Sequence, residues 1–104
     1  MKKAEVLLAG QFKDFLASLA PDSKRKLRAG LCGLETDRGD IEELVDDLTG
    51  YRRLRVGSFR VIHQEGFKEG RPVRECVFAN YRNVVYELFA RMILDDVRSE
   101  HPSA

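Results

Sequence analysis

The feature that most constrains the fold is an alternation of polar and apolar residues on both sides of a small turn. Residues 53–56 (RLRV) alternate with a period of two, and extended sequence resumes over residues 59–63 (FRVIH). The intervening Gly57-Ser58 suits a two-residue turn, because glycine readily adopts the positive φ that tight hairpin turns need. Since alternate side chains of a strand point to opposite faces, this stretch predicts a β-hairpin with one polar and one apolar face.

A two-residue turn also fixes which side chains lie opposite one another. Arg55 then faces Arg60, and Arg53 faces Ile62. Directly opposed side chains share a face, so Arg53, Arg55 and Arg60 project from one side of the hairpin. The other side, which we expect to pack against helices, carries Leu54, Val56, Phe59 and Val61.

The N-terminal part of the chain predicts a strand followed by two helices. Residues 4–9 (AEVLLA) suit a short strand, and apolar residues 12, 15, 16 and 19 have the spacing of one helix face. We expect Pro21 to end this helix and Asp22-Ser23 to cap the next one. Leucines 27, 31 and 34 form one stripe of that second helix.

The rest of the chain predicts strands and a C-terminal helix. Residues 41–48 have helical spacing and favour a short third helix; 66–72 (GFKEGRP) predict a turn, 73–80 a strand and 85–97 a helix. Residues 99–104 are expected to form a flexible tail. The order predicts one α+β domain over residues 1–104, with a small antiparallel-rich sheet of about four strands packed on an N-terminal helical hairpin, and a C-terminal helix.

The distribution of charge permits a polyanionic partner. The formal net charge is only +1, but residues 51–91 carry 9 basic and 4 acidic side chains. Because direct opposition of like charges is destabilising, three arginines on one strand face favour an anionic ligand, and guanidinium donors match phosphate oxygens. Arg82 and Tyr86 could join this site. The alternative is that carboxylates such as Asp46, Asp47 or Glu75 neutralise the cluster.

Several other classes of function lack support in the sequence. No apolar run approaches the length of a membrane span, and the N-terminal apolar stretch is too short for a secretory signal. Cys32 and Cys76 are isolated, which favours reduced thiols in a cytoplasmic protein. No GxxxxGK[ST], HExxH, GxSxG or CxxC pattern occurs, so we expect no cofactor and no metal. His63 falls on the apolar face and is interpreted as a structural histidine.

Residues 48–63 (LTGYRRLRVGSFRVIH) resemble the signature hairpin of the RelE/ParE toxin superfamily, in which an L-x-G stretch leads into R-L-R-V-G-x-[YF]-R-V-I-Y. The strand–helix–helix opening and the R-x-x-x-Y spacing of Arg82 and Tyr86 extend the resemblance from about residue 5 to residue 90. It implies the toxin of a type II toxin–antitoxin pair, neutralised by a cognate antitoxin. The RelE branch cleaves mRNA in the ribosomal A site, whereas the ParE branch poisons DNA gyrase.

The RelE branch implies a metal-independent endoribonuclease in which a ribose 2′-OH attacks the adjacent phosphate. Motif positions then assign the catalytic roles to Arg53, Arg55, Arg60, Arg82 and Tyr86. Relatives often carry lysine where this chain has Arg53 and Arg55. Arginine is a poor general base, because its guanidinium group stays protonated. Two alternatives therefore stand beside the nuclease: a gyrase inhibitor without catalysis, and a degenerate member that only binds an antitoxin.

Overall fold

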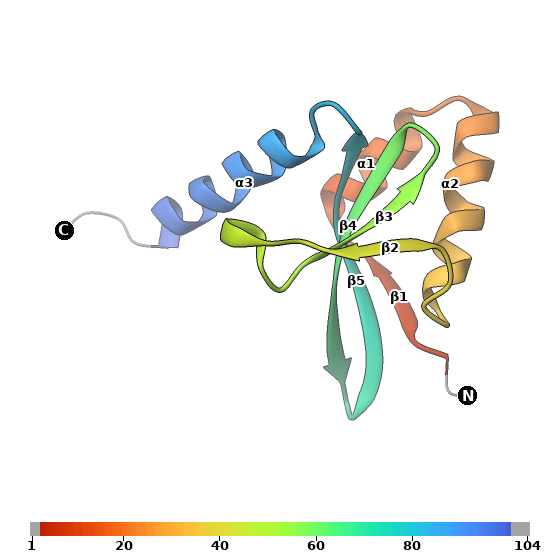
Figure 1. Cartoon of the computed structure of the whole chain (residues 1–104), viewed down its shortest axis with the longest axis horizontal. Coiled ribbons are helices and arrows are strands. Elements are labelled where there is room, and N and C mark those ends of the chain that lie inside the picture. Colours follow the sequence, from red (N-terminus) through yellow and green to blue (C-terminus); the bar gives the residue numbers. More distant parts are fainter. Residues whose placement is uncertain (1–2, 101–104) are drawn as a thin grey trace.

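A five-stranded mixed sheet forms the centre of the computed structural model, which describes residues 3–100 (Figure 1). The strand order is β1-β5-β4-β3-β2; β1 and β5 are parallel, and the other neighbours are antiparallel. The α+β class and the antiparallel-rich sheet are confirmed. Along the chain the elements are β1 (Glu5–Leu8), α1 (Gly10–Ser18), α2 (Pro21–Leu34), β2 (Asp40–Glu43), the 3-10 helix η1 (Asp46–Leu48), β3 (Arg52–Val56), β4 (Phe59–Lys68), β5 (Arg71–Tyr81) and α3 (Val85–Glu100).

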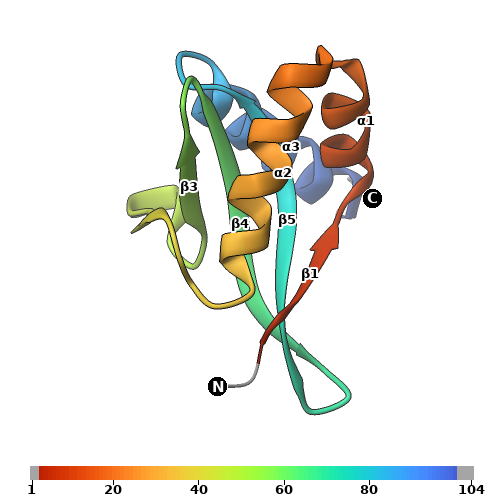
Figure 2. The same cartoon turned by 90° about the vertical axis from the view of Figure 1, so that its right-hand side faces the viewer.

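Helices cover both faces of the sheet, with α1 and α2 on one side and α3 on the other (Figure 2). On the first face, Phe12 and Leu27 are buried against Leu54 and Val61. Burying one such side chain contributes about 1.5–3 kcal/mol, so this cluster supplies much of the stability. The N-terminal helical hairpin and the C-terminal helix are therefore confirmed. The α3 side has a smaller core of Ile62, Phe78, Val85 and Phe89.

The hairpin register expected from the Gly57-Ser58 turn is confirmed. Val56 pairs with Phe59 and Arg55 with Arg60 on the two sides of the turn. Gly57 has a φ of 57°, as expected for a glycine in the first central position of a hairpin turn. Leu54 and Val56 of β3, and Phe59 and Val61 of β4, face α1 and α2. Arg53, Arg55 and Arg60 lie on the α3 side, the face that also carries the buried Ile62.

The predicted helix over residues 41–48 is wrong. Asp40–Glu43 forms the edge strand β2, which pairs with β3, and only Asp46–Leu48 adopts a short 3-10 turn. The pairing places Asp40 opposite Arg55 and Glu42 opposite Arg53. These opposite charges favour the strand, so tertiary pairing overrides the local helical spacing. The sheet consequently has five strands rather than about four.

Two of the predicted boundaries shift for reasons of local backbone chemistry. Pro21 begins α2 instead of merely ending α1, because its missing N–H costs nothing in the first turn of a helix. Ala20 is the N-cap residue, and within the described residues no backbone N–H at the start of α2 donates to a capping side chain, so the predicted cap at Asp22-Ser23 is wrong. α3 continues to Glu100, so the expected tail begins within a helix, and its residues 101–104 lie outside the described residues.

The β4–β5 hairpin is longer than predicted. Residues 66–72 are not a loop, because β4 runs to Lys68 and β5 starts at Arg71. Only Glu69 and Gly70 form the turn, and both have positive φ angles, of 52° and 77°. Positive φ at both central residues matches the right-handed twist of the strands, which allows the pairing to continue to the tip.

A Gly30→Ala substitution in α2 is expected to destabilise the fold by about 1–2 kcal/mol, although alanine is normally favoured in helices. A Cβ atom at this position would lie 2.6 Å from Val56 Cγ2, and a β-branched side chain has little freedom to move away. Urea denaturation measures the loss.

The matched control is Gly10→Ala at the start of α1. In the described chain a Cβ there meets no atom within 4 Å, so stability should be unchanged or higher. The double variant Gly30→Ala/Val56→Ala should lose less than the sum of its single variants, because removing the methyl groups relieves the clash. A Gly30→Ala protein as stable as the parent would contradict this packing.

Candidate functional site

Three of the five predicted site residues gather around the Gly57-Ser58 turn. Arg55 and Arg60 are directly opposed on the α3 side of the sheet. Arg82 follows the end of β5, and its backbone N–H donates a 2.8 Å hydrogen bond to the Ser58 carbonyl. Through this bond the segment between β5 and α3 is fastened to the hairpin turn. We call Arg55, Arg60 and Arg82 the turn arginines.

The turn arginines differ in how firmly they are held. Arg60 Nη1 donates to the carbonyl oxygens of Gly57 and Phe59, each at 2.9 Å. Within the described residues it has no carboxylate partner, and the same is true of the exposed Arg82. Arg55 is half exposed and lies 3.9 Å from Asp40 Oδ2. Arg60 is thus oriented by backbone acceptors while its charge stays uncompensated.

Arg53 shares the face of Arg55 and Arg60 but is neutralised by β2. Its Nη1 lies 3.2 Å from Asp40 Oδ1, and its Nη2 donates to Glu42. Only 16% of the Arg53 side chain is exposed. Burial lowers the pKa of the guanidinium, but the hydrogen bonds that Arg53 donates to Asp40 and Glu42, together with their charges, outweigh this effect and raise the pKa overall. The sequence left open that nearby carboxylates neutralise the arginine cluster, with Asp46, Asp47 and Glu75 as candidates. Such neutralisation occurs at Arg53, but the carboxylates that provide it are Asp40 and Glu42.

Tyr86 lies in the first turn of α3 and is half-buried against the core on that side of the sheet. That core includes Phe89 and Ile62, so part of the Tyr86 ring has a packing role. The structure therefore brings three of the predicted residues to the hairpin turn, pairs Arg53 with carboxylates, and places Tyr86 where α3 meets the sheet.

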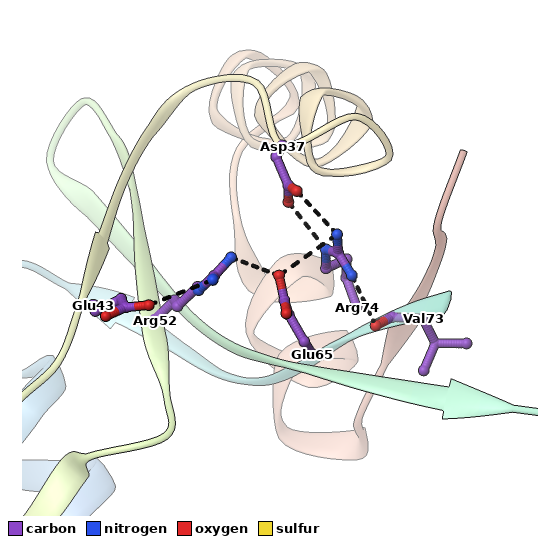
Figure 3. Close-up of polar contacts among 6 residues, drawn as sticks. All are labelled: Asp37, Glu43, Arg52, Glu65, Val73 and Arg74. Carbon is purple, nitrogen blue, oxygen red and sulfur yellow. Dashed lines mark hydrogen bonds and ion pairs between the residues drawn. The ribbon is translucent and has the colours of Figure 1, made fainter. Parts of the chain in front are cut away.

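A second charged cluster on the opposite face was not recognised in the sequence (Figure 3). Arg74 contacts both oxygens of Asp37 at 3.0 Å, and its Nη2 lies 3.6 Å from Glu65. Arg52 Nη1 contacts the same Glu65 oxygen at 2.6 Å, and its Nη2 lies 3.4 Å from Glu43. The hydrogen bonds from Arg74 lower the pKa of Asp37. These contacts fasten the loop after α2 to β3, β4 and β5.

His63 is fully buried beneath this cluster, as expected for a structural residue. It pairs with Arg52 on β3 and Cys76 on β5. Within the described chain neither ring nitrogen has a hydrogen-bond partner. Burial, followed by the charges of Arg52 and Arg74, lowers the pKa of His63 to about 4. The imidazole is neutral at pH 7 and cannot reach a substrate at the surface.

Further features of the described residues concern metals, thiols and membranes. They contain no group of three or more His, Cys, Asp or Glu side chains arranged to hold a metal ion. Cys32 is exposed, Cys76 is buried, and both are free thiols. None of the helices in this part of the chain has the length and apolar character needed to cross a membrane.

Comparison with known proteins identifies the fold through structure alone. No protein-family model matches the sequence, and no curated protein matches it. The RelBE2 toxin–antitoxin complex from Mycobacterium tuberculosis contains a chain with a TM-score of 0.65 and 17% identity, covering 77% of this chain and 99% of that one. The YoeB/ParE toxin from Agrobacterium tumefaciens has a TM-score of 0.62 and 14% sequence identity, and the match covers 75% of this chain and 98% of the toxin. A chain of the RelB–RelE complex from Methanococcus jannaschii has a TM-score of 0.55 and 16% sequence identity, and the match covers 80% of this chain and 98% of that one.

The chain therefore has the fold of these toxins, as the resemblance of its hairpin to the RelE/ParE superfamily implied. The similarity extends over nearly the whole length of those chains. At 14–17% identity it identifies the architecture, and the activity has to be argued from the side chains of this protein.

The buried His63 should make stability depend on pH. Below its ordinary pKa of 6.5 the unfolded chain binds a proton that the folded chain does not bind until about pH 4. The free energy of unfolding should therefore fall by about 2 kcal/mol between pH 7 and pH 5, a window in which most carboxylates remain ionised. Urea denaturation at both pH values measures the decrease.

The His63→Leu variant, with an apolar side chain of similar volume, serves as the control. It cannot take up a proton when unfolded, so most of the decrease between pH 7 and pH 5 should disappear. A parent protein equally stable at both pH values would show that the folded chain already binds this proton.

Proposed function

We propose that this chain is the toxin of a type II toxin–antitoxin system and that it cleaves mRNA in the ribosomal A site, in the cytoplasm. The fold of the RelE, YoeB and ParE toxins supports the toxin assignment. The observation that carries the nuclease assignment is the position of the turn arginines. Arg60 and Arg82 lie beside one hairpin turn and, within the described residues, have no carboxylate partner.

The proposed reaction is an internal transesterification. The ribose 2′-oxygen attacks the adjacent phosphorus and loses its proton, and the bond from phosphorus to the 5′-oxygen breaks as that oxygen gains a proton. A 2′,3′-cyclic phosphate and a 5′-hydroxyl result. Negative charge accumulates on the phosphoryl oxygens in the transition state, so donors already oriented toward it are effective. Arg60, held by two carbonyls, is the best oriented donor, and Arg55 and Arg82 complete the group.

The proposed reaction depends on positioning and charge stabilisation more than on a strong base. Arginine stays protonated, and His63 is buried on the other face. Tyr86 is left as the residue that stacks on a base or takes part in proton transfer. A catalyst of this kind needs its substrate held in line for attack. The ribosomal A site, which fixes the mRNA codon, supplies that constraint.

An antitoxin protein is the second proposed partner. Two of the similar structures, from M. tuberculosis and M. jannaschii, are complexes of a toxin with its antitoxin. We expect a cognate antitoxin to bind this chain and block the turn arginines.

One observation favours a rival function. Arg53, a predicted catalytic residue, is occupied by Asp40 and Glu42. A chain with this cation neutralised could act by binding alone, either as a ParE-like inhibitor of DNA gyrase or as a member that only binds an antitoxin.

Replacing a turn arginine should abolish cleavage. In cells expressing the chain, primer extension on translated mRNA should detect cuts within codons, and Arg60→Ala or Arg82→Ala should reduce them by about 10²-fold or more. Arg91→Ala is the control, because this exposed residue of α3 pairs with Glu87 away from the turn and its loss should leave cleavage unchanged.

The same cells distinguish the rival functions. Growth arrest with intact mRNA and stabilised gyrase–DNA breaks would replace the nuclease with a gyrase inhibitor. Normal growth and intact mRNA, with an antitoxin still bound, would indicate the degenerate member.

The salt dependence of RNA binding should give the number of arginines that contact phosphate groups. With Arg53 neutralised, three arginines remain, so the logarithm of affinity for a 2′-O-methyl RNA oligonucleotide should fall against the logarithm of salt with a slope of about −2. The double variant Asp40→Asn/Glu42→Gln releases Arg53 and should steepen the slope to about −3. Fluorescence anisotropy over a series of KCl concentrations measures both. A slope near zero for the parent would contradict phosphate binding by this group.

A further inference from the structure

On the other side of the Gly57-Ser58 turn from the arginine face there is a hollow of about 240 Å³. It lies between the N-terminal part of α2, the hairpin turn and the end of β5. Its lining includes one lysine, two serines and two aromatic residues, and within the described residues it contains no carboxylate. Lys26 of α2, Ser58 of the turn and Tyr81 of β5 lie around this hollow.

Tyr81 gives the hollow a firmly held aromatic surface. The ring packs edge-on against Phe15, with centroids 5.9 Å apart and an interplanar angle of 82°. It also contacts Phe59 at 5.1 Å, so two neighbours restrict its rotation. Tyr81 nevertheless remains 46% exposed. A half-exposed ring that loses little conformational freedom on binding is the kind of surface on which nucleic acid bases stack.

Lys26 supplies positive charge at the same hollow. It is exposed, and among the described residues its amine forms no ion pair. An uncompensated ammonium beside an aromatic ring suits a nucleotide, because the phosphate is anionic and the base has a flat apolar face.

The hollow and the turn arginines lie on opposite sides of the Gly57-Ser58 turn. Tyr81 and Arg82 are consecutive, and Arg82 is hydrogen-bonded to Ser58 in the turn itself. Gly57 presents no side chain, and within the described structure a Cβ there would meet no atom within 4 Å. A single strand bound at the turn arginines can therefore pass closely over the turn into the hollow.

We propose that this hollow is a subsite for the nucleotide next to the cleaved bond of single-stranded RNA. The base stacks on Tyr81, and the neighbouring phosphate contacts Lys26. This inference rests on the proposed function for the identity of the strand, but its binding chemistry can be tested without any cleavage. Lys26 and Tyr81, which hold this neighbouring nucleotide, are separate from the turn arginines, which act on the phosphate at the cleaved bond.

The test is titration of the full chain with a 2′-O-methyl tetra-adenylate, which cannot be cleaved, followed by ¹H–¹⁵N NMR. Backbone resonances of Lys26, Gly57, Ser58 and Tyr81 should shift along with those of the turn arginines. Tyr81→Leu should weaken binding by about tenfold or more, since loss of one stacked base has that effect. Tyr81→Phe keeps the ring and should restore binding to within about twofold of the parent.

Lys26→Gln provides a second test at an exposed position that does not disturb the core. It should make the slope of log affinity against log salt less steep by about 0.7, whereas Lys13→Gln on the exposed face of α1 should not change it. Shifts confined to the turn arginines, equal binding by Tyr81→Leu, or no shifts at all would overturn the subsite. Shifts at the hollow in a protein that cuts no mRNA would retain it while rejecting the nuclease.

Discussion

The register of the β3–β4 hairpin is the constraint on which the rest of the structure depends. Because Gly57 permits a two-residue turn, Arg55 must lie opposite Arg60, and Leu54 opposite Val61. One face of the hairpin then packs on α1 and α2, and the other carries guanidinium groups. A shift of one residue would bury the arginines and expose the core, so register and site are specified together.

Neighbouring elements then decide which cations remain available. β2 contributes Asp40 and Glu42, which neutralise Arg53 and leave Arg55 only weakly paired. Arg52, next to Arg53 but on the opposite face, is bound by Glu65 and Glu43. Sequential arginines thus have different roles because strand alternation sends them to different surroundings. The charge available for an anionic ligand is concentrated at the hairpin turn.

Sequence reasoning predicted what depends on local periodicity and failed where pairing partners decide. The hairpin, the buried His63 and the helical stripes followed from spacing. β2 was missed because Ile41, Leu44 and Leu48 also fit a helix, and only their position beside β3 selects a strand. The ion pairs of Arg53 depend on that missed strand, and the hollow at Tyr81 depends on packing between distant segments. An acidic residue on either side of Ile41 was the available signal for an edge strand facing arginines.

The parallel pairing of β1 with β5 has a consequence for how the chain folds during synthesis. Gln11, just after β1, exchanges two hydrogen bonds with Ala79 of β5, 68 residues further along. Contacts over such separations form late, because the entropy of closing a long loop is lost before they stabilise anything. Arg82 comes after β5, so the turn arginines assemble only once β5 has been made and has paired with β1. A nascent chain that has not yet been extended through Arg82 therefore lacks the complete cationic group.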